Sequence, residues 1–165
     1  MRRVSMTVTI FCFVCVYSLV VWGARAGSAT DDFRLSQGQT LYVPVYSNVL
    51  IGDRPQAFEL ASTLSIRNTD IEQPIKILFA DYYDTKGKRI KRFLAEPLTI
   101  GPLSTKYFFI EEKDTSGGLG ANFIIEWAAA QMVNEPIIEC VMIGTRLGLG
   151  ISLVSPGKVI RGKSE

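Results

Sequence analysis

The sequence predicts an all-β protein, an antiparallel Ig-like β-sandwich of about seven or eight strands. Three observations predict this class. Short apolar segments alternate with polar residues at a period of two, turn-forming residues recur about every 8–12 residues, and no long segment has the period of an amphipathic helix. The chain of 165 residues has room for one domain. Two cysteines flanking a tryptophan, the mark of true Ig domains, are not found, so only the architecture is predicted.

Residues 1–26 have the composition of a signal peptide. A basic start, Met1–Arg3, precedes the apolar run Thr7–Trp22, and Ala24–Ala26 gives the small-x-small pattern after which signal peptidase cuts. We expect cleavage after Ala26. The alternative is an uncleaved signal anchor, since a run of about 16 apolar residues approaches the roughly 17 that span a bilayer. The mature protein is then periplasmic or secreted, with a flexible lead-in at 27–39 and a single domain at 40–160.

Removal of this leader changes the charge of the protein. All 16 acidic residues remain, but Arg2, Arg3 and Arg25 leave, so the net charge of +2 becomes −1. A nearly neutral domain lacks the basic face that nucleic acids or anionic membranes attract. We therefore expect no nucleic-acid partner, and membrane contact only through an uncleaved leader.

One cysteine, Cys140, remains after removal of the leader, so no disulfide within the chain is expected. It lies in the apolar run IIECVMIG, which predicts a buried thiol of the core. The alternative is a reactive thiol or an intermolecular disulfide.

The first half of the domain reads as strands separated by turns. Thr40–Tyr46 is a strand in which Pro44 indicates an edge position or a bulge, and Ser47–Pro55 is a loop. Phe58–Arg67 alternates as a half-buried strand. Ile75–Asp84 follows as another strand. The side chains expected to share the inner face of these two strands are Phe58, Leu60, Leu64 and Ile66, and Ile75, Ile77 and Phe79.

The middle of the domain continues this pattern. Asp84–Gly87 is a hairpin turn, because glycine adopts the left-handed conformation, and Arg89–Leu94 returns as a strand. Leu98–Leu103 is a crossing segment. Thr105–Glu112 is apolar on both faces, which predicts either a central strand or an aromatic patch on the outer face.

The last third contains the least clear-cut segment. Asn122–Trp127 predicts a strand, whereas Glu126–Met132 favours one helical turn after it. Val133–Pro136 is expected to end this helical turn. Further strands are expected at Ile137–Gly144 and Ile151–Val154, separated by a glycine-bearing turn, with 158–160 as an extension of the last strand.

Several runs carry a family resemblance: LYVPVYS, LSIRNTD, DYYDTKGK, EEKDTSGGLGANFIIEW, NEPIIECVMIGT and GISLVSPGKVI. In this order they resemble the bacterial domain-of-unknown-function family 3124, an exported group with no established activity, over roughly residues 35–160. The resemblance implies a secreted or periplasmic bacterial protein. It implies no catalytic residue, ligand or partner.

The chain contains no histidine, which excludes much enzyme chemistry. Ser-His-Asp and Cys-His nucleophile pairs are ruled out, as are metal sites with histidine ligands. A single mature cysteine rules out thiolate clusters as well. A serine–lysine dyad of Ser116 with Lys113 is a weak alternative, and we expect no cofactor.

Two groups of carboxylates are candidates for chemistry. Asp81 and Asp84 flank two tyrosines, and Glu111, Glu112 and Asp114 form a second group. The second group could hold calcium or act as an acid/base pair of a hydrolase. The simpler interpretation is that Asp84 caps its turn and that the second group is a solvated strand end.

The glycine-rich segment 114–122 is the first place to look for a ligand. Its glycines could direct successive amide groups at an anion, with the candidate residues Asp114, Ser116, Gly117, Gly118, Asn122 and Trp127. It lacks the ending of a phosphate-binding P-loop. The alternative is a tight connection whose glycines supply positive φ angles.

These observations lead to three functional hypotheses. The first is a non-enzymatic binding module of the cell envelope that recognises a protein or a small ligand. The others are an envelope hydrolase acting through carboxylates and a calcium-stabilised structural module. An outward aromatic face or an unpaired edge strand would favour the binding module.

Overall fold

The computed structural model describes residues 34–146 and 148–162, which belong to the unit Phe33–Glu165. The expected signal peptide, and the lead-in as far as residue 33, lie outside these residues. The described residues form twelve strands, more than the seven or eight expected, and their bounds are as follows. They are β1 Leu35–Val45, β2 Asn48–Ile51, β3 Gln56–Glu59, β4 Ala61–Arg67, β5 Ile75–Tyr83, β6 Arg89–Arg92, β7 Leu98–Ile100, β8 Thr105–Ile110, β9 Ala121–Asn134, β10 Ile137–Arg146, β11 Leu149–Pro156 and β12 Lys158–Gly162.

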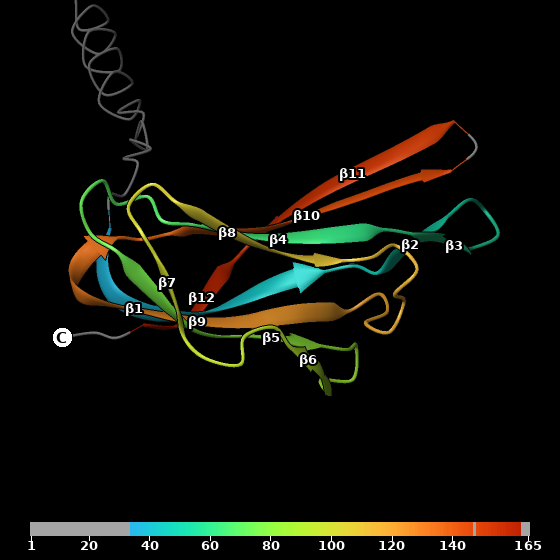
Figure 1. Cartoon of the computed structure of the whole chain (residues 1–165). Coiled ribbons are helices and arrows are strands. Elements are labelled where there is room, and N and C mark those ends of the chain that lie inside the picture. The colour runs from blue at the N-terminus through green and yellow to red at the C-terminus, as the bar shows by residue number, and fades with distance from the viewer. Residues whose placement is uncertain (1–33, 147, 163–165) are drawn as a thin grey trace, which may run out of the picture. The chain divides into compact units, whose positions relative to one another are not determined.

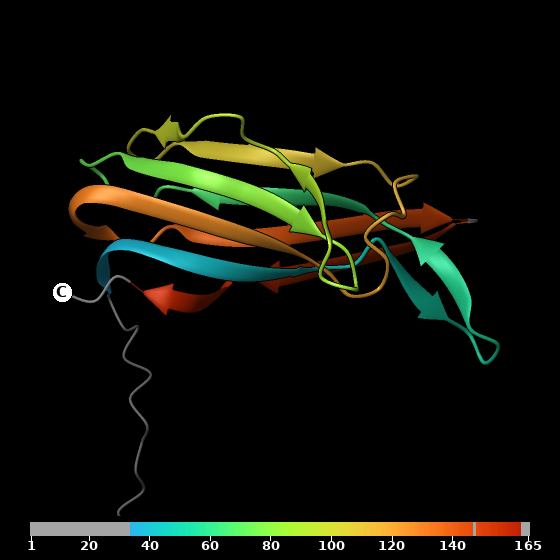
Figure 2. The same ribbon diagram turned by 90° about the horizontal axis from the view of Figure 1, so that it is seen from below.

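The strands form two main antiparallel sheets. One has six strands in the order β12-β1-β9-β5-β6, with β7 also paired to β5, and the other has the order β11-β10-β4-β8. Figure 1 shows the two sheets as layers, and Figure 2 shows the six-stranded sheet from below. The β2–β3 hairpin is a separate small sheet. The prediction of an all-β, antiparallel protein is confirmed.

The core lies between the two main sheets. Both contribute alternate side chains to one buried cluster, as a period of two requires. The largest buried side chains of the six-stranded sheet are Trp127, Tyr82, Phe123, Ile75, Ile77 and Ile125, and those of the four-stranded sheet include Leu64, Ile66 and Met142. Cys140 is also fully buried there, as predicted.

Register shifts in β5 and β1 explain where the alternation differs from expectation. In β5 the register with β9 shifts between Ile77 and Phe79. Ala80 is therefore buried, and Phe79, expected on the inner face, is only half-buried. In β1 the register shifts twice. Pro44 lies beyond the last residue paired with β12, at an edge position where its missing N–H costs no hydrogen bond.

The predicted helical turn after Trp127 is wrong. Strand β9 continues to Asn134, because it is paired with both β1 and β5 as far as Ala128 and with β1 again at Val133 and Asn134. Ala128 lies opposite Gly38 of β1 and Lys76 of β5. Strand pairing before and after the Ala-Ala-Ala run outweighs its helix propensity, which is a difference of only tenths of a kcal/mol per residue.

Other boundaries were also misplaced. Strand β1 begins at Leu35, inside the expected lead-in, and β2 occupies part of the expected loop 47–55. The last strand is divided at Gly157, where the chain passes from β11 in one sheet to β12 in the other. A Cβ at Gly157 would lie 2.9 Å from the carbonyl oxygen of Ile138, so glycine permits this close crossing.

Candidate functional site

The glycine-rich connection between β8 and β9 is held by its own hydrogen bonds. The carboxylate of Asp114 accepts bonds from the backbone N–H of Ser116 at 3.1 Å and from its hydroxyl at 2.5 Å. The N–H of Gly118 donates to the carbonyl of Thr115. The N–H of Gly120 donates to Oγ1 of Thr85 at 2.9 Å. Three amide groups of the loop are therefore already bonded within the protein.

The same loop is fastened to its surroundings through carbonyl groups. The carbonyl of Gly117 accepts bonds from the N–H and the hydroxyl of Thr85, at 3.0 and 2.9 Å. The carbonyl of Gly118 accepts a bond from the N–H of Ser47. Gly118 has a φ of 74°, which favours glycine. These contacts support the interpretation of the segment as a tight connection.

Gly117 lies against Tyr82, which explains why a glycine occupies this position. A Cβ there would overlap Oη of Tyr82 and would lie 2.7 Å from Cβ of Ala121. The Tyr82 ring is 1% exposed, and its hydroxyl is 3.0 Å from that of Ser47. Burial raises the pKa of Tyr82, so the phenol remains protonated and acts as a structural hydrogen-bonding group.

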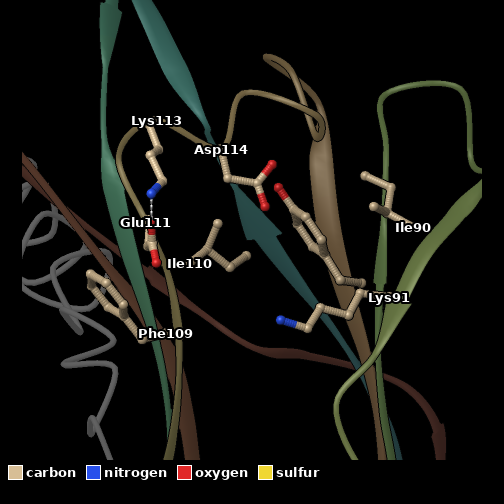
Figure 3. Close-up of a pocket in the computed structure, with 8 residues that line it drawn as sticks. Ile90, Lys91, Phe109, Ile110, Glu111, Lys113 and Asp114 are labelled. Atoms are coloured by element: carbon tan, nitrogen blue, oxygen red, sulfur yellow. Dashed lines mark ion pairs between the residues drawn. The ribbon is translucent and has the colours of Figure 1, made fainter.

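A pocket of about 350 Å³ lies beside the loop, between strands β8 and β6 at the free edges of the two sheets. Figure 3 shows Phe109, Glu111 and Lys113 on one side of it and Ile90 and Lys91 on the other. Its lining residues are Tyr82, Ile90, Lys91, Phe109, Ile110, Glu111, Lys113 and Asp114. Its size is at the low end for small-molecule sites.

The three carboxylates proposed as metal ligands are not brought together. Glu111 pairs with Lys113 at 2.7 Å on the surface, and it shares the pocket with Asp114. Glu112 lines a different pocket of about 290 Å³, with Glu59 and Arg146. Within residues 34–146 and 148–162, no group of three potential metal ligands is found.

Two further candidate residues lie away from the loop surface. Asn122 is 9% exposed at the start of β9. Trp127 is fully buried further along the strand, opposite Gln39 and Ile77, and its Nε1 has no hydrogen-bond partner. Trp127 is therefore a core residue that a surface ligand at the loop does not reach.

Asp81 is a buried carboxylate whose structural role the sequence analysis did not predict. Asp81, with a side chain 3% exposed, accepts hydrogen bonds from Arg92 at 2.9 and 3.0 Å and from Arg89 at 3.1 Å. The bonds from Arg92 are the main reason that the pKa of Asp81 is lowered. The basic run KGKRIKR after Asp84 contained the signal, since two arginines beside a strand carboxylate favour charge-assisted bonds. Asp84 itself caps the turn, accepting bonds from the N–H groups of Lys86 and Lys88.

The outer face of the four-stranded sheet is mostly apolar. One row across it consists of Phe109, Thr63, Val141 and Val154, one residue from each strand. Its large side chains are strongly exposed: Tyr107 66%, Phe109 51%, Ile143 52% and Val154 57%. We call the residues of this surface, Ala61, Thr63, Ser65, Arg67, Thr105, Tyr107, Phe109, Ile137, Glu139, Val141, Ile143, Ser152, Val154 and Pro156, the outer face.

Charge on the outer face is confined to one pair. Arg67 and Glu139 are its charged members, and their side chains lie 3.7 Å apart at one end. Strand β8 is at the edge, with Phe108 and Ile110 buried and Tyr107 and Phe109 outward. Of the two alternatives for the two-sided strand, the structure shows the outward aromatic patch. It also leaves β8 with a free edge.

Cys140 is not available for reaction in the folded protein. It is fully buried, and burial raises its pKa to about 12. A thiol with so high a pKa carries almost no thiolate at neutral pH, and the thiolate is the reactive form.

The sheet topology and the exposed apolar residues define a class of protein: an all-β domain of antiparallel sheets with an apolar outer surface on one sheet. The chain belongs to the family described as "Protein of unknown function (DUF3124)", which matches residues 38–160. No curated protein matches the chain. The solved structure "Crystal Structure of Thermotoga maritima 1070" is similar at a TM-score of 0.45 and 12% identity, over 76% of this chain and 97% of that chain. At that score it carries no argument about fold or function. No helix among the described residues is long and apolar enough to cross a membrane.

Proposed function

We propose that this protein is a non-enzymatic, exported binding module of the cell envelope, with an Ig-like sandwich that contacts a partner protein through its outer face. The observation that carries the proposal is the outer face itself, where exposed aromatic and aliphatic side chains of β8, β10 and β11 flank Ala61, Thr63 and Ser65 of β4, with a single ion pair at one end. Contiguous exposed apolar surface marks interaction sites in soluble proteins. Aromatic side chains are also enriched where partners bind.

Three observations support a protein partner over the alternatives. The amides of Ser116, Gly118 and Gly120, and the carboxylate of Asp114, are bonded internally. The acidic residues Glu111 and Glu112 line separate pockets. The chain has no histidine to serve as a base. Export rests on the composition of residues 1–26, and the near-neutral charge is consistent with a protein surface as the target.

Lysine substitutions on the outer face test the proposal. In the full chain, Ile143→Lys with Val154→Lys places two charges on the outer face without disturbing the core, because both side chains are more than half exposed. The matched control is Ile160→Lys, since Ile160 of β12 is 56% exposed on the other sheet.

Each tagged protein is recovered from the envelope of the producing cell, and the proteins that co-purify are quantified. We expect wild type and Ile160→Lys to retain a common partner. The amount of this partner recovered with the double variant should fall at least about tenfold, which corresponds to a loss of roughly 1.4 kcal/mol of binding free energy. Equal recovery by all three proteins, with unchanged thermal midpoints, would refute a role for the outer face.

A further inference from the structure

Strand β8 has an edge that the described chain leaves unpaired. It pairs with β4 alone, in an unbroken register from Ser62 opposite Ile110 to Arg67 opposite Thr105. Among residues 34–146 and 148–162, no backbone hydrogen bond joins its other side to a loop. The strand contains no proline and no bulge, two of the devices that commonly prevent edge pairing, and it carries one charged side chain, Lys106. Such an edge is a template for another strand.

We propose that β8 pairs antiparallel with β8 of a second copy of this chain, about a two-fold axis at Phe108. The two four-stranded sheets then join into one continuous sheet, and their outer faces become neighbours. An isologous contact of this kind brings the same surface patch from both copies together. The inference goes beyond the proposed function, because it concerns the edge of the sheet and not the apolar surface.

The register follows from the alternation of the strand. Residues that face each other across two strands lie on the same side of the sheet, so a two-fold axis must pass through a residue. An axis at Phe108 places Tyr107 of each copy opposite Phe109 of the other, which gives two aromatic cross-strand pairs on the outer side. Aromatic pairs of this kind stabilise the pairing of neighbouring strands. All these residues lie inside β8 as observed.

The charges of the strand favour the same register. Lys106, the single charged residue of β8, then faces Ile110 of the second copy, and the two Lys106 side chains lie far apart. An axis at Tyr107 would instead place the two Lys106 side chains diagonally beside each other. An axis at Phe109 would require Glu112 to extend the strand, but the carbonyl of Glu111 is already used in a turn by the N–H of Asp114 at 2.9 Å.

Cysteine cross-linking tests both the pairing and its register. The full chain is used with Cys12→Ser and Cys15→Ser, and buried Cys140 is left in place. Tyr107→Cys and Phe109→Cys are made separately with tags of different size, mixed and oxidised. Both sites are exposed, so both variants are expected to fold. We expect the mixed 107–109 disulfide to exceed either homodimer at least fivefold, and no cross-link from the chain without a new cysteine.

A charge substitution gives an independent readout by sedimentation. Phe109→Lys removes both aromatic pairs and places two lysines diagonally beside each other, so the dimer dissociation constant should rise at least tenfold. Val154→Lys, on the same face but on β11, should leave it unchanged. This control also separates the two proposals, because Val154→Lys weakens partner binding without affecting the dimer.

Three results would overturn the inference. They are a protein that stays monomeric up to about 100 µM, a dimer that Phe109→Lys leaves intact, and homodimeric disulfides at residue 109 that exceed the mixed product. The concentration limit is chosen because a pairing weaker than this corresponds to less than about 5.5 kcal/mol of association free energy.

Discussion

Gly117 shows how one residue can fix the position of a whole loop. Its missing Cβ lets the β8–β9 connection lie directly against the hydroxyl of Tyr82. Both Gly117 and Tyr82 are buried, so the loop closes that part of the core. The glycine is therefore required by a close approach, not by a positive φ angle, because Gly117 is not among the glycines with such an angle.

Gly117→Ala should destabilise the protein by about 2–3 kcal/mol, since overpacking a close contact forces the backbone to shift. Chemical denaturation measures the change. Tyr82→Phe in the same chain should recover part of the loss, because the oxygen that overlaps the new methyl group is removed while the ring carbon at 2.7 Å remains. Strict additivity of the two changes would contradict the contact.

Asp81 is the second residue whose burial has an energetic consequence. Removing its charge leaves Arg89 and Arg92 without their carboxylate, and Asp81→Asn should lower the free energy of unfolding by about 2 kcal/mol at pH 7. Because the pKa of Asp81 is lowered in the folded protein from its ordinary value of 3.8, mainly by the bond from Arg92, its contribution is complete above that value. It is lost as the pH falls through the folded-state pKa.

Denaturation at several pH values tests this sign. The difference between wild type and Asp81→Asn should be constant from pH 7 to about pH 5 and should shrink below about pH 4. Glu96→Gln, a change of the same chemistry at an exposed residue, should have almost no effect at any pH. A difference that grows on acidification would contradict the assignment.

Among the elements, the β8–β9 connection depends on the β5–β6 hairpin. Thr85 both donates to the carbonyl of Gly117 and accepts from the N–H of Gly120. Thr85→Val removes both bonds and should cost about 1–2 kcal/mol. Hydrogen exchange in segment 113–120 should accelerate, while Thr99→Val on β7 should leave that segment unchanged. Unchanged protection in Thr85→Val would show that the loop is held by other contacts.

The same hydrogen bonds predict that the loop does not bind anions. Millimolar phosphate should therefore not raise the thermal midpoint of the wild-type protein, whereas a ligand of the native state must raise it by mass action. Calcium, added with and without chelator, should likewise have no effect that Asp114→Asn abolishes. A calcium-dependent rise abolished by that substitution would revive the metal hypothesis.

Elements were predictable where the signal is local. The alternation of Phe58, Leu60, Leu64 and Ile66 identified their buried face, and all four are buried. Strand β9 was truncated because its continuation depends on pairing with β1 and β5, which are distant in sequence. The bulge after Ile77 moved Phe79 off the inner face for the same reason. Such non-local pairing overrides intrinsic propensity.

The candidate site was predictable only in part. The tight-connection interpretation of the glycine loop followed from composition, but its dependence on Thr85 and Tyr82 did not, since these residues lie more than thirty positions away. Trp127 was placed near the loop because it ends the same apolar run, and its burial is decided by the facing sheet. The sequence predicted the exposed aromatic residues of β8 only as one of two alternatives, the other being a central strand buried on both faces.

For the whole molecule, the two sheets have different surroundings. The chain begins and ends its described part in the six-stranded sheet, through β1 and β12 (Figure 1). The four-stranded sheet turns an apolar surface outward. Both sheets contribute large apolar side chains to one shared core. The exposed apolar rows contribute nothing to that core, so we infer that they serve recognition.

The most direct test of this claim is photo-cross-linking in the producing cell. A photoreactive amino acid is placed in the full chain at Ile143 on the outer face and, separately, at Ile160 on β12, two isoleucines of similar exposure. We expect one discrete adduct of this chain with another envelope protein from position 143, and none from position 160. Adducts of equal yield from both positions, or none from either, would contradict the claim that the outer face is the binding surface.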